Sequence, residues 1–140
     1  MKRFAICVLT VVIVAECCGA TLGADQDKPS VRTAPPVVVK TVPEAGDMKV
    51  DPATTEIQVT FSKKMQNGSW SWSSVSEETT PQTTGKPHYL ADGKTCVLPV
   101  TLEPGKTYGF WLNSQKFRGF KDAKGQPAIP YLLIFETSKK

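Results

Sequence analysis

Alternation between apolar and polar residues is the clearest pattern along this chain. Residues 56–61 set Ile57, Val59 and Phe61 on one face and polar side chains on the other. A period of two is typical of a β-strand with one buried face. Similar runs, bounded by turn-forming residues, predict further strands. The predicted strands cover residues 37–41, 56–61, 69–73, 88–90, 95–100, 107–112 and 131–137.

The same alternation predicts which side chains form the core. The inward residues of the strands at 95–100 and 107–112 are expected to be Cys96, Leu98, Val100, Tyr108, Phe110 and Leu112, with Trp111 facing outward. The chain contains 11 prolines and 10 glycines, and none of its segments has a convincing helical pattern. About seven short strands separated by turns are typical of an all-β sandwich.

The first twenty residues have the pattern of a secretory signal peptide. Lys2 and Arg3 precede an apolar stretch over residues 4–15, and small residues follow at 18–20. The apolar stretch is too short for a membrane span of about 20 residues. Cleavage after Ala20 is expected, with cleavage after Ala24 as the alternative. A lipid anchor at Cys17 is not expected, because Glu16 occupies the position where a lipobox has a small residue.

Three segments follow from this pattern. Residues 1–20 are the predicted signal peptide, residues 21–34 are a polar flexible tether, and residues 35–140 form one domain of ordinary size. Removal of the signal peptide leaves Cys96 as the only cysteine, so the exported domain is expected to have no internal disulfide bond. The predicted location is the periplasm, the cell surface or the exterior, with no membrane span in the mature chain.

The segment from Leu102 to Tyr108 suggests a specific structural feature. Pro104 and Gly105 form a turn that leads into the strand at 107–112. A tyrosine near the start of such a strand can make a hydrogen bond back across the corner, as in immunoglobulin-like sandwiches. We therefore predict a tyrosine corner at Leu102, Pro104, Gly105 and Tyr108.

Several segments, in this order, resemble the bacterial immunoglobulin-like domain of the SbsA type. They are 35–43, 57–65, 102–108, 120–127 and 134–137, with Gln126 where the family usually has Asn. The resemblance covers about residues 35–137. It implies an immunoglobulin-like β-sandwich that acts as a non-catalytic module, serving as a spacer or a protein-contact surface in cell-surface and secreted proteins. No cofactor is implied.

Composition and charge limit the other function classes. Hydrophobic residues make up 40% of the chain and charged residues 21%, which excludes a disordered polyelectrolyte and a membrane bundle. The formal net charge of +4 does not require a nucleic-acid partner, and an exported protein rarely meets one. Catalysis is not expected, because the single histidine, His88, has no nucleophile motif near it and Glu77 and Glu78 lie in a polar stretch.

One surface patch is a candidate binding site. An outward Trp111 near the loop that follows it can contact a protein or a sugar. The loop combines basic and aromatic residues, which suits an acidic partner protein or an anionic surface polymer. The predicted patch consists of Trp111, Phe117, Arg118, Phe120 and Lys121.

Two alternatives to a protein-contact module remain open. The first is a small periplasmic carrier of copper, a similarity suggested by the exported sandwich. Its sulfur ligands would be Cys96, Met48 and Met65, and the histidines that such sites use are missing except for His88. Asp92 and Asp122 are too few for a dense calcium loop. The second alternative is a carbohydrate-binding module that uses Trp111.

Overall fold

The computed structural model describes residues 28–139. Within them, the chain from Ala34 onward forms one compact unit. The predicted signal peptide lies outside the described residues. Of the predicted tether, residues 28–34 are described; they are exposed, and Ser30 and Thr33 share hydrogen bonds in a turn.

Eight strands and no helix make up the described part of the chain, which confirms the predicted all-β sandwich. The strands are β1 (Val38–Val42), β2 (Glu56–Phe61), β3 (Trp72–Ser74), β4 (Gln82–Thr83), β5 (His88–Tyr89), β6 (Thr95–Thr101), β7 (Thr107–Leu112) and β8 (Tyr131–Glu136). The strand that the sequence did not predict is β4, whose two residues are both exposed.

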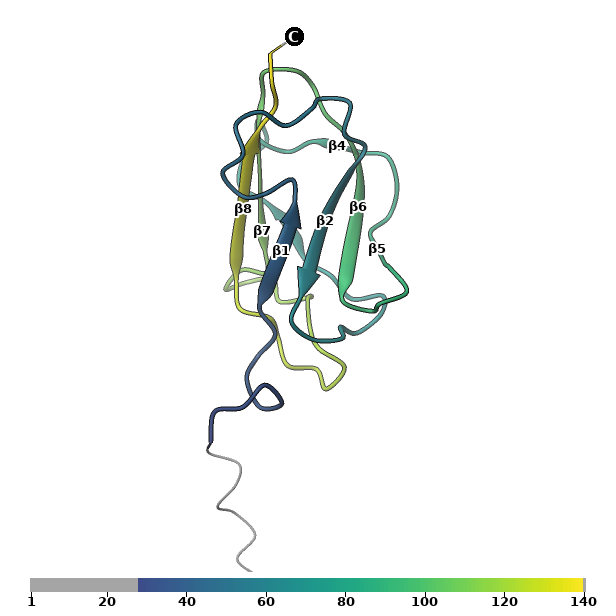
Figure 1. The fold of residues 1–140 in the computed structure, drawn as a ribbon, viewed down its shortest axis with the longest axis vertical. Helices are drawn as coiled ribbons and strands as arrows, with labels where there is room; N and C mark the ends of the chain where they lie inside the picture. The colour runs from purple at the N-terminus through teal and green to yellow at the C-terminus, as the bar shows by residue number, and fades with distance from the viewer. Residues whose placement is uncertain (1–27, 140) are drawn as a thin grey trace, which may run out of the picture. The chain divides into compact units, whose positions relative to one another are not determined.

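The strands form two antiparallel sheets (Figure 1). The larger sheet has the order β1-β2-β6-β4, and β5 pairs with β6 along the same edge as β4. The smaller sheet has the order β3-β7-β8. Short β3 is therefore one edge strand of the smaller sheet, opposite β8, and β4 and β5 form one edge of the larger sheet, opposite β1.

The core lies between the facing sides of the two sheets. Buried residues alternate along β2 and β8 as the sequence predicts, with Ile57, Val59 and Phe61 on β2 and Leu133 and Phe135 on β8. On β6 the alternation is lost, because Val97 is buried as well as Cys96 and Leu98. The predicted inward residues of β6 and β7 are all buried in the same cluster. Trp72 adds edge-on ring contacts to Phe110 and Phe120, with centroid distances of 5.6 and 5.7 Å.

Two exposed strand edges are partly protected. Val39 has no cross-strand partner because the pairing of β1 with β2 shifts between Val38 and Lys40. A bulge of this kind discourages pairing with another chain. At the free side of β8, backbone groups of residues 46–50 make hydrogen bonds to Ile134 and Glu136 at 2.7–3.1 Å.

The corner before β7 has the geometry expected from the sequence. The backbone N–H of Glu103 donates a 2.8 Å hydrogen bond to the hydroxyl oxygen of Tyr108. Gly105 has a φ of 65°, in the left-handed region that glycine tolerates best. Leu102 is buried beneath this turn, whereas Pro104 is exposed. The corner thus connects the end of β6 to the start of β7 by a side-chain hydrogen bond.

Candidate functional site

The structure separates the residues of the predicted surface patch. Trp111 is exposed on the outer face of β7, and Phe117 and Arg118 are exposed in the loop that follows. Lys121 is half-buried and pairs with Pro127 through an isolated β-bridge. The prediction that Phe120 belongs to this surface is wrong, because its side chain is completely buried.

Asn113 explains why Phe120 is buried. The Asn113 side-chain amide donates hydrogen bonds to the carbonyl oxygens of Phe120 and Ala128, at 2.9 and 3.0 Å, and its oxygen accepts one from the Phe120 N–H at 2.9 Å. These bonds hold the loop against the core, where the Phe120 ring contacts Phe61 with a centroid distance of 4.9 Å. Asn113 was not among the residues predicted from the sequence. The signal in the sequence was an asparagine directly after a strand, since asparagine tolerates the left-handed backbone that the structure shows here, with a φ of 60°.

A second contact fixes the same loop against residues 69–71. A Cβ atom added at Gly119 would lie 2.1 Å from the carbonyl oxygen of Trp70, so only glycine fits there. The Ser69 hydroxyl donates a hydrogen bond to the Gly119 carbonyl oxygen. The loop therefore holds the backbone of Trp70 in one position.

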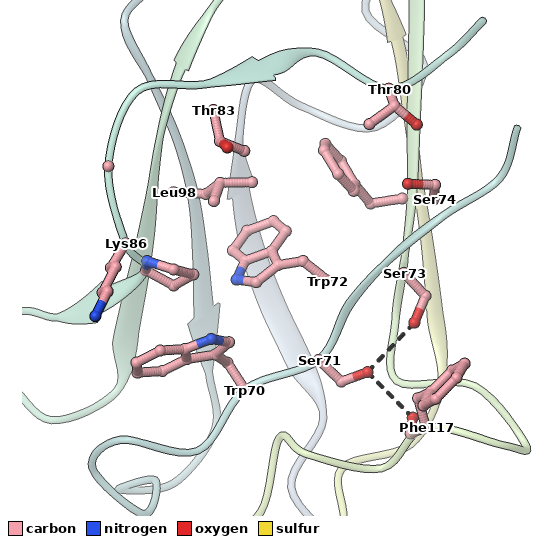
Figure 2. Close-up of a pocket in the computed structure, with 13 residues that line it drawn as sticks. Trp70, Ser71, Trp72, Ser73, Ser74, Thr80, Thr83, Lys86, Leu98 and Phe117 are labelled. Carbon is pink, nitrogen blue, oxygen red and sulfur yellow. Dashed lines mark hydrogen bonds between the residues drawn. The ribbon is translucent and has the colours of Figure 1, made fainter. Parts of the chain in front are cut away.

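This arrangement leaves an open groove between the β3 edge of one sheet and the β4–β5 edge of the other. We call it the tryptophan groove, and its volume is about 710 Å³. Figure 2 shows the rings of Trp70 and Trp72 with Leu98 on one side and Ser71, Ser73 and Phe117 on the other. Its lining is Trp70, Ser71, Trp72, Ser73, Ser74, Thr80, Thr83, Gly85, Lys86, Pro87, Leu98, Phe110 and Phe117.

Apolar rings and hydroxyl groups alternate in this lining. Among the described residues, five serines or threonines face the groove beside two tryptophans, and Lys86 is the one charged lining residue. The Trp72 indole N–H is buried and has no hydrogen-bond partner among the described residues. An interaction with this indole lowers the pKa of the Cys96 thiol, against the larger opposing effect of burial. Trp72 is therefore a wall of the groove, and its polar atom is turned away from solvent.

The outer face of the β3-β7-β8 sheet is a second candidate surface. Trp111 pairs with Leu132 across β7 and β8, and Gly109 pairs with Ile134 in the same register. A Cβ atom at Gly109 would lie 3.2 Å from Val75, so the Val75 side chain covers this glycine. We call Val75, Trp111, Leu132 and Ile134 the apolar face; each is 38–44% exposed.

The residues considered for metal binding lie in separate environments. Cys96 is in the core, and burial raises the pKa of its thiol to about 12, which disfavours the thiolate that ligates metals. Met65 is buried, whereas Met48 is exposed. Within residues 28–139, the His, Cys, Asp and Glu side chains form no group of three or more that could hold a metal ion.

The two aspartates considered for calcium are used for local structure. A hydrogen bond from the Thr95 hydroxyl, with two more from backbone N–H groups, lowers the pKa of Asp92. Asp122 is buried and accepts hydrogen bonds from the N–H groups of Lys124 and Gln126, both at 2.9 Å. Both carboxylates thus stabilise turns.

Comparison with known proteins gives one family match. The sequence profile of the bacterial Ig-like domain matches residues 32–137. A search of curated proteins finds no match. Within the described residues, no helix has the length and apolar character needed to cross a membrane.

Proposed function

The chain belongs to the bacterial Ig-like domain family, and from this premise we propose that it is a non-catalytic interaction module of the cell envelope. Its apolar face binds a partner protein. Domains of this family are generally non-enzymatic and are commonly found outside the cell or on its surface. The signal-peptide pattern of residues 1–20 supports export of this chain.

The apolar face is the observation that carries this proposal. Large apolar residues cover the middle of a regular sheet, where an exported monomer would otherwise place polar side chains. Tryptophan is one of the residue types enriched among the residues that dominate binding energy at protein interfaces. Beside Trp111 there is also a hollow of about 370 Å³, lined by Ser114, Gln115 and Pro130. This hollow can accept an anchoring side chain of a partner.

The proposal is tested by capture from envelope extract with the tagged full chain. Ile134→Lys adds a charge to the apolar face, and Thr101→Lys adds the same charge at the exposed end of β6. We expect Ile134→Lys to lose a partner that wild type and Thr101→Lys both retain, since a desolvated charge opposes binding. Equal capture by both variants would contradict the proposal.

A second copy of the chain could also cover the apolar face. Analytical ultracentrifugation of the purified protein tests this outcome. The proposal requires a monomer at micromolar concentration. A dimer that Ile134→Lys converts to monomer would show that the apolar face binds another copy and would contradict a separate partner.

A further inference from the structure

We propose that the tryptophan groove is a saccharide-binding site. This inference goes beyond the proposed function and concerns a different surface, because none of the four residues of the apolar face lines the groove. The ligand class is a short chain of pyranose units, either neutral or acidic. The carbohydrate site suggested by the sequence lies at Trp111 instead.

The lining matches the two kinds of surface that a pyranose ring presents. One face of the sugar ring consists of C–H groups and packs on a flat aromatic ring, while its hydroxyl groups exchange hydrogen bonds around the edge. The groove offers the half-buried Trp70 indole together with several hydroxyl groups. Binding sites generally combine an apolar, aromatic lining with a few polar groups that fix orientation.

Some polar groups of the lining remain available to a ligand. The Thr80 hydroxyl donates to the Ser76 carbonyl oxygen, and the Ser71 hydroxyl lies 3.3 Å from the Phe117 carbonyl oxygen. By contrast, the side chains of Ser74, Thr83 and Lys86 make no hydrogen bond or ion pair to other residues in the described part of the chain. We call the rings of Trp70 and Trp72 the aromatic wall, and Figure 2 shows these three side chains around it.

The aromatic wall is held in place before any ligand arrives. The Tyr89 hydroxyl donates a 3.0 Å hydrogen bond to the Ser69 carbonyl oxygen, immediately before Trp70. The Asn113 N–H donates a 3.2 Å bond to the Ser71 carbonyl oxygen, immediately after it. Together with the close approach of Gly119, these contacts fix the backbone on both sides of Trp70. A rigid platform lowers the entropy lost on binding.

Charge and edge length favour a saccharide over an extended peptide. Lys86 is the one charged residue of the lining, so the groove accepts a neutral or acidic ligand and offers no carboxylate for a basic one. A peptide that binds as an added strand needs a long free edge for its backbone hydrogen bonds. The strands beside the groove are short, with three residues in β3 and two in β4.

The test is a fluorescence titration of the full chain carrying Trp111→Phe, so that Trp70 and Trp72 are its remaining tryptophans. The probes are cellotetraose, chitotetraose and tetragalacturonate. We expect at least one of them to change the emission with a Kd of about 1 mM or tighter. Unchanged emission with all three at about 10 mM would overturn the proposal.

Two further variants connect the signal to the groove. Trp70→Ala should weaken binding of the responding saccharide at least about tenfold. Because this change also removes core contacts, circular dichroism must first show that the variant folds. Thr83→Val alters an exposed residue with almost no change in shape, and it should weaken binding at least about threefold.

Other results would contradict a saccharide site. Unchanged affinity in Thr83→Val and in folded Trp70→Ala would place the saccharide elsewhere. A pool of extended peptides that changes the emission while all three saccharides do not would show a peptide site instead. Ile134→Lys should leave saccharide binding intact, so failure of this inference is distinguishable from failure of the proposed protein contact.

Discussion

Replacing Asn113 gives the most informative test of how the loop is held. In Asn113→Ala, the Phe120 N–H and the Ala128 carbonyl oxygen lose their side-chain partner. The Phe120 carbonyl oxygen loses one bond but still accepts the 2.9 Å hydrogen bond from the Ala128 N–H. Two buried backbone groups are therefore left without a partner, and alanine must also adopt the φ of 60°.

The expected loss of stability follows from the two unsatisfied backbone groups and the left-handed backbone. Each unsatisfied buried group costs about 1–3 kcal/mol, so the two cost about 2–6 kcal/mol unless water reaches them. The left-handed backbone adds about 1 kcal/mol for alanine. Asn113→Gly loses the same hydrogen bonds but avoids the backbone cost, so it should be more stable than Asn113→Ala by about 1 kcal/mol.

Urea denaturation followed by tryptophan fluorescence measures these differences. Asn67→Ala is the matched control, since Asn67 is exposed and its side chain has no hydrogen bond to the described residues. We expect the control to change the free energy of unfolding by less than about 0.5 kcal/mol. The reasoning fails if Asn113→Ala stays within about 1 kcal/mol of wild type, or if Asn113→Gly is as unstable as Asn113→Ala.

Three other changes have defined outcomes. Tyr108→Phe should lower the free energy of unfolding by about 1–2 kcal/mol in the same assay, because the Glu103 N–H loses its acceptor. Tyr131→Phe removes a hydroxyl with no hydrogen bond to the described residues, and an equal effect there would refute the tyrosine corner. Gly119→Ala should cost about 3 kcal/mol or more in thermal unfolding, since its Cβ would collide with the Trp70 backbone; a wild-type melting temperature would contradict this contact. Iodoacetamide at about pH 8 should modify Cys96 only in denaturant, because burial raises the pKa of the thiol to about 12. Peptide mapping separates Cys96 from the three cysteines of residues 1–20, and rapid labelling of Cys96 in the native protein would disprove this.

Much of the sandwich was predictable because its strands alternate regularly. Ile57, Val59 and Phe61 occupy one face of β2, and burial of that face follows from the period of two. Trp111 was correctly expected to face outward for the same reason. β4 could not be found in this way, since neither Gln82 nor Thr83 is buried and a two-residue strand has no period.

The loop after β7 shows where the local pattern stops being informative. Phe120 lies among basic residues and looks like part of an exposed loop, yet hydrogen bonds from Asn113 and the bare backbone of Gly119 hold it in the core. The tryptophan groove depends on the same long-range contacts. It brings Trp70 near Lys86 and Phe117, which are far apart in the sequence.

Site-specific photo-crosslinking tests the proposed protein contact most directly. A photoreactive amino acid replaces Leu132 in the apolar face, and in a control protein it replaces Thr101 at the exposed end of β6. In envelope extract, we predict one crosslinked partner from position 132, none from position 101, and loss of the adduct in Ile134→Lys. Crosslinks of equal yield from both positions, or an adduct that Ile134→Lys leaves unchanged, would contradict binding through the apolar face.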